Sequence, residues 1–532
     1  MNGGPVTGLR FRRLRSGPPD TVAGDLEDGV GQVGRLLHPA GSEAAIAAGK
    51  RARVGSAPFE TTTAVAAEKL EAILDGGGVL VSTGQQPGLF LGPLFTLYKI
   101  LTAASHASRI EAATGRPALA SFWIAGDDHD WKEVGTASLV DRAGVLHRFV
   151  LEPEASEAER GVGQATLGRR IEPILVGFLE AAGESEFAPD VSEILRSAYR
   201  PESTVSGAFR DALKSLLAGV DVALFDPSHR EARRASIPFL TSLLRQPDAV
   251  TAALASGSAR LEEAGYEIQL RPPPAGSQVF YDDGRSRAHL IGEAAGFRHG
   301  RAGEWRSTED WVSLLESDPS WFSPAAATRP VLESALLPVA RTILGPGEMA
   351  YWAQLGLLFD QMEVPMPETV SRDAWMIVEP KVERWLEGIG TDPGDLEDGS
   401  ESIERRLTAE NRPEMVDRRL REFRAELTGG LTELADTTRS ELPGLDAAFG
   451  KADKALQDAL TVLEGTIDAR VREARQTALQ RVRRAAALLY PEGRRQERVD
   501  SPISFLVRYG QLFLEESARA SGIEPAPRAG TG

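Results

Sequence analysis

The chain has 532 residues, 42% of them hydrophobic, and a formal net charge of −17. Its length exceeds that of one ordinary domain and predicts roughly two to four structural units. The negative charge argues against general nucleic-acid binding, which requires a basic surface, but it allows a local basic pocket for an anionic substrate.

The chain contains no cysteine, so disulfides, thiolate metal sites and cysteine nucleophiles are excluded. Residues 1–15 are polar and glycine-rich, and they lack the apolar segment of a signal peptide. No apolar run is long enough to span a membrane. We therefore expect a cytoplasmic protein with neither a membrane nor a nucleic acid as its partner.

Four short apolar runs, each ending in Gly, Asp or Pro before a helical pattern, predict a parallel, doubly wound sheet of the α/β class. The runs are 79–82, 118–126, 220–227 and 342–347. In such sheets ligands bind at the carboxyl ends of the strands. The loops that follow these runs are therefore the candidates for a functional site.

The loop after the first run is rich in glycine and proline and leads into a helical pattern that begins near Leu94. Glycine lets the backbone approach a ligand closely, and the free N–H groups of a helix start attract phosphate. A tight strand-to-helix turn without a ligand explains the same residues about equally well. The loop matches neither a Walker A nor a GxGxxG motif. The candidate nucleotide-binding residues are Gly84, Gln85, Gln86, Gly88, Gly92, Pro93, Thr96 and Lys99.

Three carboxylates and a histidine follow the second run directly, at residues 127–130. Such a group can perform acid/base chemistry or hold a metal. The alternative is a helix N-cap with solvated acids, for which Asp is well suited. We expect catalytic roles for Asp128, His129 and Asp130, assign no metal ligands, and leave the metal requirement open.

Two long stretches interrupt the strand–helix alternation. The first, about 133–217, is mostly helical after a strand-like start. The second, about 265–320, contains alternating segments that predict a small antiparallel insertion. Both are expected to be inserts into one core that spans residues 1–384.

The loop after the last run, GPGE at 345–348, repeats the pattern of glycines before a helix. Arg329, upstream of it, has the forked guanidinium that binds carboxylates at two points. Tyr351 and Trp352 are expected to line a pocket, although core packing explains this aromatic pair better. Glu348 suits the first turn of a helix equally well. The candidate substrate-binding residues are Arg329, Gly345, Gly347, Glu348, Tyr351 and Trp352.

The carboxyl-terminal part changes character. Residues 385–490 are rich in Glu, Arg, Ala and Leu, and apolar residues between Leu445 and Leu463 recur at alternating steps of four and three. This spacing predicts helices that pack as an antiparallel coiled coil, with a reversal near 442–444. The exposed seam favours a homodimer. Residues 491–532 are expected to return to the core and to end in a disordered tail.

Five segments, in this order, resemble the cysteine ligase family of bacillithiol biosynthesis. They are STGQQPGLFLGPLFTLYK, FWIAGDDHDWKEV, FSPAAATRPVLESALLPVARTILGPGEMAYW, VPMPETVSR and LYPEGRRQERV, within about residues 77–510. Two positions depart from the family pattern: Asp127 stands where relatives often carry Glu, and Tyr98 where they often carry His. The HIGH and KMSKS elements of true synthetases are also missing.

The resemblance implies a Rossmann-like core similar to that of class I aminoacyl-tRNA synthetases, with two connecting-peptide inserts and a coiled coil that supports a homodimer. The implied reaction joins L-cysteine to glucosaminyl malate, the last step of bacillithiol synthesis. ATP or another nucleotide would then activate the cysteine carboxylate as an adenylate or phosphate. The cluster at 128–130 would deprotonate the glucosamine amine, and Arg329 with the 345–347 loop would bind substrate carboxylates.

Two alternatives remain open. One is a nucleotide-binding ligase or transferase that acts on another amino acid or sugar. The other is a catalytically inactive, dimeric nucleotide-binding scaffold. Placement of the 127–130 and 345–348 loops in one pocket would favour an enzyme, whereas loops far apart would favour the scaffold.

Overall fold

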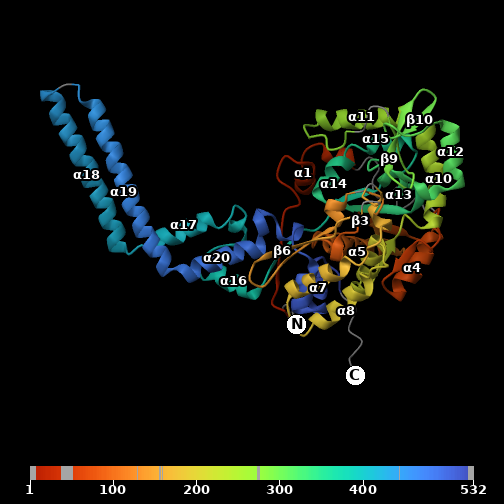
Figure 1. The fold of residues 1–532 in the computed structure, drawn as a ribbon, viewed down its shortest axis with the longest axis horizontal. Helices are drawn as coiled ribbons and strands as arrows, with labels where there is room; N and C mark the ends of the chain where they lie inside the picture. Colours follow the sequence, from red (N-terminus) through yellow and green to blue (C-terminus); the bar gives the residue numbers. More distant parts are fainter. Residues whose placement is uncertain are drawn as a thin grey trace. The chain divides into compact units, whose positions relative to one another are not determined.

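The structure is a computed structural model that describes residues 7–37, 52–128, 130–154, 157–158, 160–271, 276–442 and 444–524. The chain divides into two compact units. Unit one comprises residues 1–377 and 496–532, and unit two comprises residues 378–495. Figure 1 shows the path of the chain and labels many of the helices and some of the strands.

The central sheet of unit one has the strand order β14-β13-β3-β4-β7-β2. All neighbours are parallel except β2, which pairs antiparallel with β7 at the edge. The strands are β2 (Phe59–Thr61), β3 (Val79–Gln85), β4 (Ala118–Ile124), β7 (Val222–Phe225), β13 (Val339–Leu344) and β14 (Glu368–Ser371). The four predicted runs form β3, β4, β7 and β13, so the predicted Rossmann-like parallel core is confirmed.

The chain changes direction across this sheet between β3 and β13. From β3 it moves outward to β4 and β7, and then returns to place β13 and β14 on the other side of β3. Neighbouring loops therefore leave the sheet in opposite directions at the β3–β13 boundary. This topological switch point is where doubly wound sheets bind ligands.

Both faces of the sheet are covered by helices. Successive side chains of a strand point to opposite faces, so each strand contributes to two cores. Val81 belongs to the core that contains Leu97 of α5 (Phe95–Thr114). Its neighbour Leu80 belongs to the other core, with Leu70 of α4 (Ala64–Leu74). This two-sided burial explains why the strands read as continuous apolar runs.

The connection from β4 to β7 begins with a short helix and a hairpin and then becomes helical. Its elements are α6 (Trp131–Val134), β5 (Thr136–Val140), β6 (Leu146–Val150), α7 (Ile171–Ala182), α8 (Ala188–Ala198) and α9 (Val205–Leu216). Phe209 of α9 contacts Phe122 of β4, with ring centroids 5.9 Å apart, so this insert packs onto the sheet.

The connection from β7 to β13 carries an antiparallel sheet in the order β11-β10-β9-β8-β12, with helices before and after it. Its elements are α10 (Arg230–Arg245), α11 (Pro247–Glu263), β8 (Gly276–Asp282), β9 (Arg287–Glu293), β10 (Gly296–His299), β11 (Trp305–Ser307), α12 (Thr308–Ser317), β12 (Phe322–Pro324) and α13 (Arg329–Leu336). Strands β8 to β11 lie within the predicted insert of about 265–320, and β12 follows just after it.

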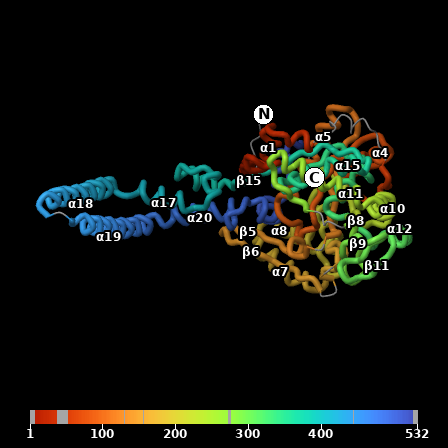
Figure 2. Tube along the Cα trace, turned by 90° about the horizontal axis from the view of Figure 1, so that it is seen from above, coloured from red at the N-terminus to blue at the C-terminus, as the bar shows by residue number. Residues whose placement is uncertain are grey.

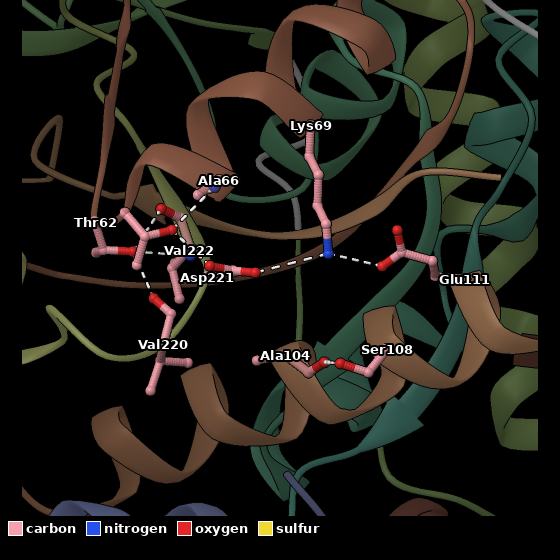
Figure 3. A network of polar contacts seen from close by, with 10 residues as sticks. Thr62, Ala66, Lys69, Ala104, Ser108, Glu111, Val220, Asp221 and Val222 are labelled. Carbon is pink, nitrogen blue, oxygen red and sulfur yellow. Dashed lines mark hydrogen bonds and ion pairs between the residues drawn. The ribbon is translucent and has the colours of Figure 1, made fainter. Parts of the chain in front are cut away.

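Polar contacts lie at the end of the sheet where the parallel strands begin (Figure 3). Thr62 Oγ1, just after β2, donates to Val220 O at 2.5 Å and accepts from Val222 N at 3.0 Å. Lys69 Nζ of α4 lies 2.7 Å from Glu111 Oε2 of α5 and 3.6 Å from Asp221 Oδ2. These contacts join both helices to the start of β7, at the end of the sheet away from the strand-end loops.

Unit two is helical and contains a long helical hairpin. Its helices are α16 (Pro380–Glu387), α17 (Glu401–Glu410), α18 (Glu414–Glu441), α19 (Asp446–Ala474) and α20 (Gln476–Leu489). Helices α18 and α19 run side by side in Figures 1 and 2, and Arg424 Nη2 of α18 lies 2.7 Å from Glu464 Oε1 of α19. The predicted antiparallel coiled coil is confirmed. The unit extends beyond the predicted 385–490 on both sides, because α16 and the turn at Pro491–Gly493 pack against α20.

After unit two the chain returns to unit one through α21 (Pro502–Tyr509) and α22 (Gln511–Ala520). Phe505 and Phe513 stack with ring centroids 5.2 Å apart inside the core that contains α5. Residues 525–532 of the predicted disordered tail lie outside the described residues. Among the helices that the structure describes, none combines the length and apolarity needed to cross a bilayer.

Candidate active site

A cavity of about 620 Å³ lies at the carboxyl ends of β3, β4 and β13, a volume typical of small-molecule sites. Its other walls are the first turns of α5, the segment around Arg329, and the hairpin of β8 and β9. The loops at 127–128 and 345–348 both line it, which is the arrangement expected of an enzyme. The predicted site residues that line it are Gly84, Gln85, Gln86, Lys99, Asp128, Arg329, Gly345, Gly347, Glu348 and Tyr351.

Other predicted residues lie away from the cavity. Residues 88–93 turn into the core, where Phe90 and Leu91 are buried and Leu91 N donates to Tyr199 Oη at 3.2 Å. Leu91 has a φ of +75°, so the loop is a packed turn at this point. The residues that do not line the cavity are Gly88, Gly92, Pro93, Thr96, Asp130 and Trp352.

The structure favours the simpler alternatives for two of these residues. Asp130 caps α6, where its Oδ1 accepts a hydrogen bond from Glu133 N at 3.1 Å. Trp352 is buried against Phe359, with ring centroids 5.8 Å apart, as core packing requires. His129 lies outside the described residues.

Lys99 is a buried cation at the centre of the site. Its Nζ donates to Gly84 O at 2.8 Å and to Gln85 Oε1 at 2.9 Å, and it forms an ion pair with Glu348. Glu348 also accepts from Gly345 N at 2.8 Å. Burial lowers the pKa of Lys99, and the Glu348 carboxylate opposes this shift. The ammonium therefore holds the loops after β3 and β13 together.

Glu133 lines the same cavity, although the sequence analysis did not select it. Its Oε1 accepts from Gln85 Nε2 at 3.1 Å, so Gln85 connects Glu133 to Lys99. Partial desolvation, followed by the charges of Asp130 and Asp128, raises the pKa of Glu133. A carboxylate with a raised pKa is a better general base. Its position three residues after a capping Asp is the sequence signal that could have identified it.

Arg329 is held at the cavity wall by a carboxylate one helical turn away. Its Nη1 donates to Glu333 Oε2 at 2.8 Å, and its guanidinium lies 5.6 Å from the ring centre of Trp123. Glu333 is buried and also accepts a hydrogen bond from Ser82. Burial raises the pKa of Glu333, and the charge of Arg329 opposes this. These contacts fix the Arg329 guanidinium at the cavity wall.

Arg372, which the sequence analysis assigned no role, lines the cavity after β14. Its two Nη atoms donate to the two carboxylate oxygens of Glu497 at 2.7 Å and 2.6 Å. The two side chains are 3% and 1% exposed, so this is a buried, two-point ion pair. It joins two of the five segments that carried the family resemblance, VPMPETVSR and LYPEGRRQERV.

The two described aspartates directly after β4, Asp127 and Asp128, make different contacts. Asp127 forms an ion pair with Arg233 of α10, whose Nη1 donates to Phe322 O at 2.9 Å. Arg233 is 8% exposed, so Asp127 neutralises a buried cation. Asp128 lines the cavity and accepts from Gln86 Nε2 at 2.9 Å. No three His, Asp or Glu side chains of the described residues are placed to hold a metal ion together.

The hairpin of β8 and β9 forms a cavity wall for which the sequence predicted no functional residues. Gln278, Phe280, Arg287 and His289 line the cavity there. The rings of Phe280 and His289 are 3.7 Å apart between centroids, and the Arg287 guanidinium lies 3.7 Å from the Phe280 ring centre.

The cavity as a whole is rich in cations, as a local basic pocket on an acidic protein requires. The cations that line it are Lys99, Arg271, Arg287, Arg329, Arg372 and Arg498, and the carboxylates are Asp127, Asp128, Glu133 and Glu348. Guanidinium groups bind carboxylates and phosphates. The site can therefore bind an anionic molecule beside a carboxylate that accepts a proton.

The chain is similar to known proteins over most of its length. Residues 56–373 match the model of "Bacillithiol biosynthesis BshC, N-terminal Rossmann-like domain", and residues 375–521 match its "C-terminal coiled-coil domain". A protein of Salinibacter ruber named "Putative cysteine ligase BshC" is 28% identical over 451 residues, 85% of this chain and 82% of that protein. A protein of Solibacter usitatus with the same name is 29% identical over 448 residues, 83% of this chain and 82% of that protein.

Proposed function

This chain belongs to the BshC family of bacillithiol biosynthesis, and from this premise we propose that it is the ligase that joins L-cysteine to glucosaminyl malate. The observation that carries the proposal is the strand-end cavity. It brings the cationic side chains of Lys99, Arg329 and Arg372 together with the carboxylate of Glu133. Both substrates carry carboxylates, and one carries the amine that must lose a proton.

The reaction forms an amide bond, and it needs an activated carboxylate because a free carboxylate is a poor electrophile towards an amine. ATP or another nucleotide would supply this activation when bound. Two observations support such a ligand. Gln86 Oε1 is buried at the cavity and has no hydrogen-bond partner among the described residues. The guanidinium groups around Lys99 suit phosphate oxygens.

The chain's own residues then divide the work. The loop at 345–348, which the Lys99–Glu348 ion pair keeps in place, holds the anionic group that activates the carboxylate. Arg329 and Arg372, each fixed by a buried acid, orient substrate carboxylates at two points. Glu133 takes the proton from the glucosamine amine, and Gln85 keeps its carboxylate in place. This assigns to Glu133 the proton transfer first expected of residues 128–130, of which Asp128 alone is described at the cavity.

Thiol profiling by mass spectrometry in a deletion strain of the host tests this function. We expect the strain to lose bacillithiol and to accumulate glucosaminyl malate, and a plasmid copy of the gene to restore both levels. A plasmid copy that carries Glu133→Gln provides the matched comparison and should not restore them. Unchanged bacillithiol in the deletion strain would contradict the proposal.

A ligase or transferase for another amino acid or sugar is the second candidate. Amino acids and amino sugars screened by thermal shift with the purified protein would separate the two. Stabilisation by cysteine and glucosaminyl malate is the expected result. Stabilisation by a different pair would favour the second candidate. The shared cavity of the 127–128 and 345–348 loops argues against the inactive scaffold.

We also propose that the helical hairpin of unit two pairs with a second copy of the chain. Met415 of α18 is 72% exposed and Val462 of α19 is 71% exposed. Few residues of these two helices are buried within the chain. Exposed apolar side chains of this size mark association surfaces. Light scattering should give a dimer for the wild type and a monomer for Met415→Glu with Val462→Glu. A monomeric wild type would contradict this.

A further inference from the structure

Gln278 combines a strained backbone with an unsatisfied side chain. Its φ is +58°, in the left-handed region that non-glycine residues adopt only at a conformational cost. The residue is 2% exposed, and its Nε2 has no hydrogen-bond partner among the described residues. Because buried amide groups are normally hydrogen-bonded, this one requires an explanation.

The backbone explains how the side chain comes to line the cavity. The pairing of β8 with β9 shifts register between Gly276 and Phe280, which is a bulge around Gln278. The carbonyl of Gln278 accepts from Ala325 N at 2.9 Å and from Thr328 Oγ1 at 3.2 Å. Bulges redirect a side chain, and here the main chain is anchored while the carboxamide donor has no acceptor within the protein.

Arg287 lies on the same wall. It precedes His289 by two residues on β9, so both share the face on which His289 pairs with Phe280. Its guanidinium lies 3.7 Å from the Phe280 ring centre, and its Nε donates to Ser323 Oγ at 3.1 Å. These contacts fix the plane of the guanidinium, which reduces the entropy lost when it binds a ligand.

We propose that Gln278 and Arg287 form a carboxylate subsite that holds the malyl group of the acceptor substrate. This identification of the ligand rests on the proposed function. A planar guanidinium and a neutral amide donor that line the same cavity wall match a planar carboxylate. The loop at 345–348, which the Lys99–Glu348 ion pair holds at the switch point, supplies the separate anion site for the activating group. The antiparallel insert is then the element that selects the acceptor.

Isothermal titration of the full-length protein with L-malate, glucosaminyl malate and inorganic phosphate tests the subsite. Gln278→Gly removes the donor and also relieves the backbone, because glycine adopts positive φ freely. We expect malate and glucosaminyl malate to bind about tenfold more weakly or worse, with an unchanged or higher melting temperature. Ala295→Gly is the matched control, since Ala295 has a φ of +61° in an exposed turn of the same insert. It should leave both affinities unchanged.

Two further variants sharpen the assignment. Gln278→Glu keeps the shape but places a second carboxylate against the ligand, so binding should weaken about a hundredfold. Arg287→Lys keeps the charge but loses the fork, and we expect about a tenfold loss.

Three results would overturn the subsite: a wild type that binds neither malate nor glucosaminyl malate, a Gln278→Gly variant that binds both like the wild type, or a loss confined to phosphate. A separate ligation assay keeps the two proposals distinct. Malate binding that depends on Gln278, without any ligation, would reject the proposed function alone. Ligation with an unchanged KM for glucosaminyl malate in Gln278→Gly would reject the subsite alone.

Discussion

The buried ammonium of Lys99 pairs with the carboxylate of Glu348, and this contact joins the helix after β3 to the helix after β13. The two strands are neighbours at the point where the chain reverses direction across the sheet. The pair therefore fixes the two loops that every ligand of the cavity would meet. It also fixes Gln85, and through Gln85 the position of Glu133.

A double-mutant cycle measures this pair. Lys99→Met leaves Gly84 O, Gln85 Oε1 and Glu348 without their donor, so we expect it to destabilise unit one by about 2 kcal/mol. Lys99→Met with Glu348→Gln should cost clearly less than the two single changes together, because the uncompensated charge is gone. Urea unfolding followed by fluorescence gives the free energies. Additive losses would show that the two side chains do not interact.

Glu133→Gln tests the proton acceptor. We expect kcat at its plateau to fall about a hundredfold or more, with little change in the melting temperature, because the amide keeps the contact with Gln85. In the wild type the rate should rise with pH through the raised pKa of Glu133, since only the carboxylate accepts a proton. A plateau rate close to that of the wild type in Glu133→Gln would exclude this role.

Asp130→Asn separates the cap from the chemistry. Asn caps a helix as well as Asp does, so α6 should persist. Because the charge of Asp130 contributes to the raised pKa of Glu133, its removal should move the acid limb of the kcat profile to lower pH. The plateau should stay within a fewfold of the wild type. A collapse of the plateau would instead return a direct catalytic role to Asp130.

Gly347→Ala tests whether the cavity is filled by a ligand. A Cβ at Gly347 would meet no protein atom within 4 Å, so the fold should tolerate it, with a gain of up to about 1 kcal/mol from helix propensity. Gly450→Ala on α19 is the matched control, because its Cβ also meets nothing. We expect KM for a substrate or the nucleotide to rise about tenfold in Gly347→Ala alone. Equal kinetics in both variants would place the ligand elsewhere.

His106 should make unit one sensitive to acid. Arg341 Nη1 donates to His106 Nδ1 at 2.7 Å, which requires a neutral ring. Burial, with the charges of Arg341 and Arg109, lowers the pKa of His106 to about 4. The unfolded chain therefore takes up a proton that the folded chain does not, and stability is lost as pH falls from about 6.5 towards 4.

His106→Gln keeps an acceptor for Arg341 but does not titrate. Relative to the variant, the wild type should lose about 2 kcal/mol of unfolding free energy between pH 7 and pH 5. Urea unfolding at the two pH values measures this difference. A constant difference between the two proteins would mean that the ring is protonated in the folded state.

The parallel core could be predicted because its signals are local. Each strand is buried on both faces, so 79–85 and 118–124 read as apolar runs, and each ends in a loop with chemical side chains. Parallel strands bring such loops to one edge, where Asp128 and Glu348 both line the cavity.

The rest of the site depends on contacts that the sequence does not display. Arg372 meets Glu497 across 125 residues, and Gln278 lines the cavity because a distant hairpin folds over the strand ends. The predicted site residues that do not line the cavity have types that serve several purposes. Asp130 caps a helix and residues 88–93 make a packed turn, and both tasks use the same Asp, Gly and Pro that build ligand loops.

Gln496 holds the chain ends of unit one together where unit two leaves and returns. Its Oε1 accepts from Ile377 N at 3.0 Å, and its Nε2 donates to Ile377 O at 3.3 Å. The whole of residues 378–495 is therefore, in topological terms, a loop between two residues that are already in contact. The helical hairpin can therefore be shortened or lengthened by whole helical turns without altering the register of any strand in the central sheet. Insertions and deletions within unit two therefore leave the strand pairing of unit one unchanged.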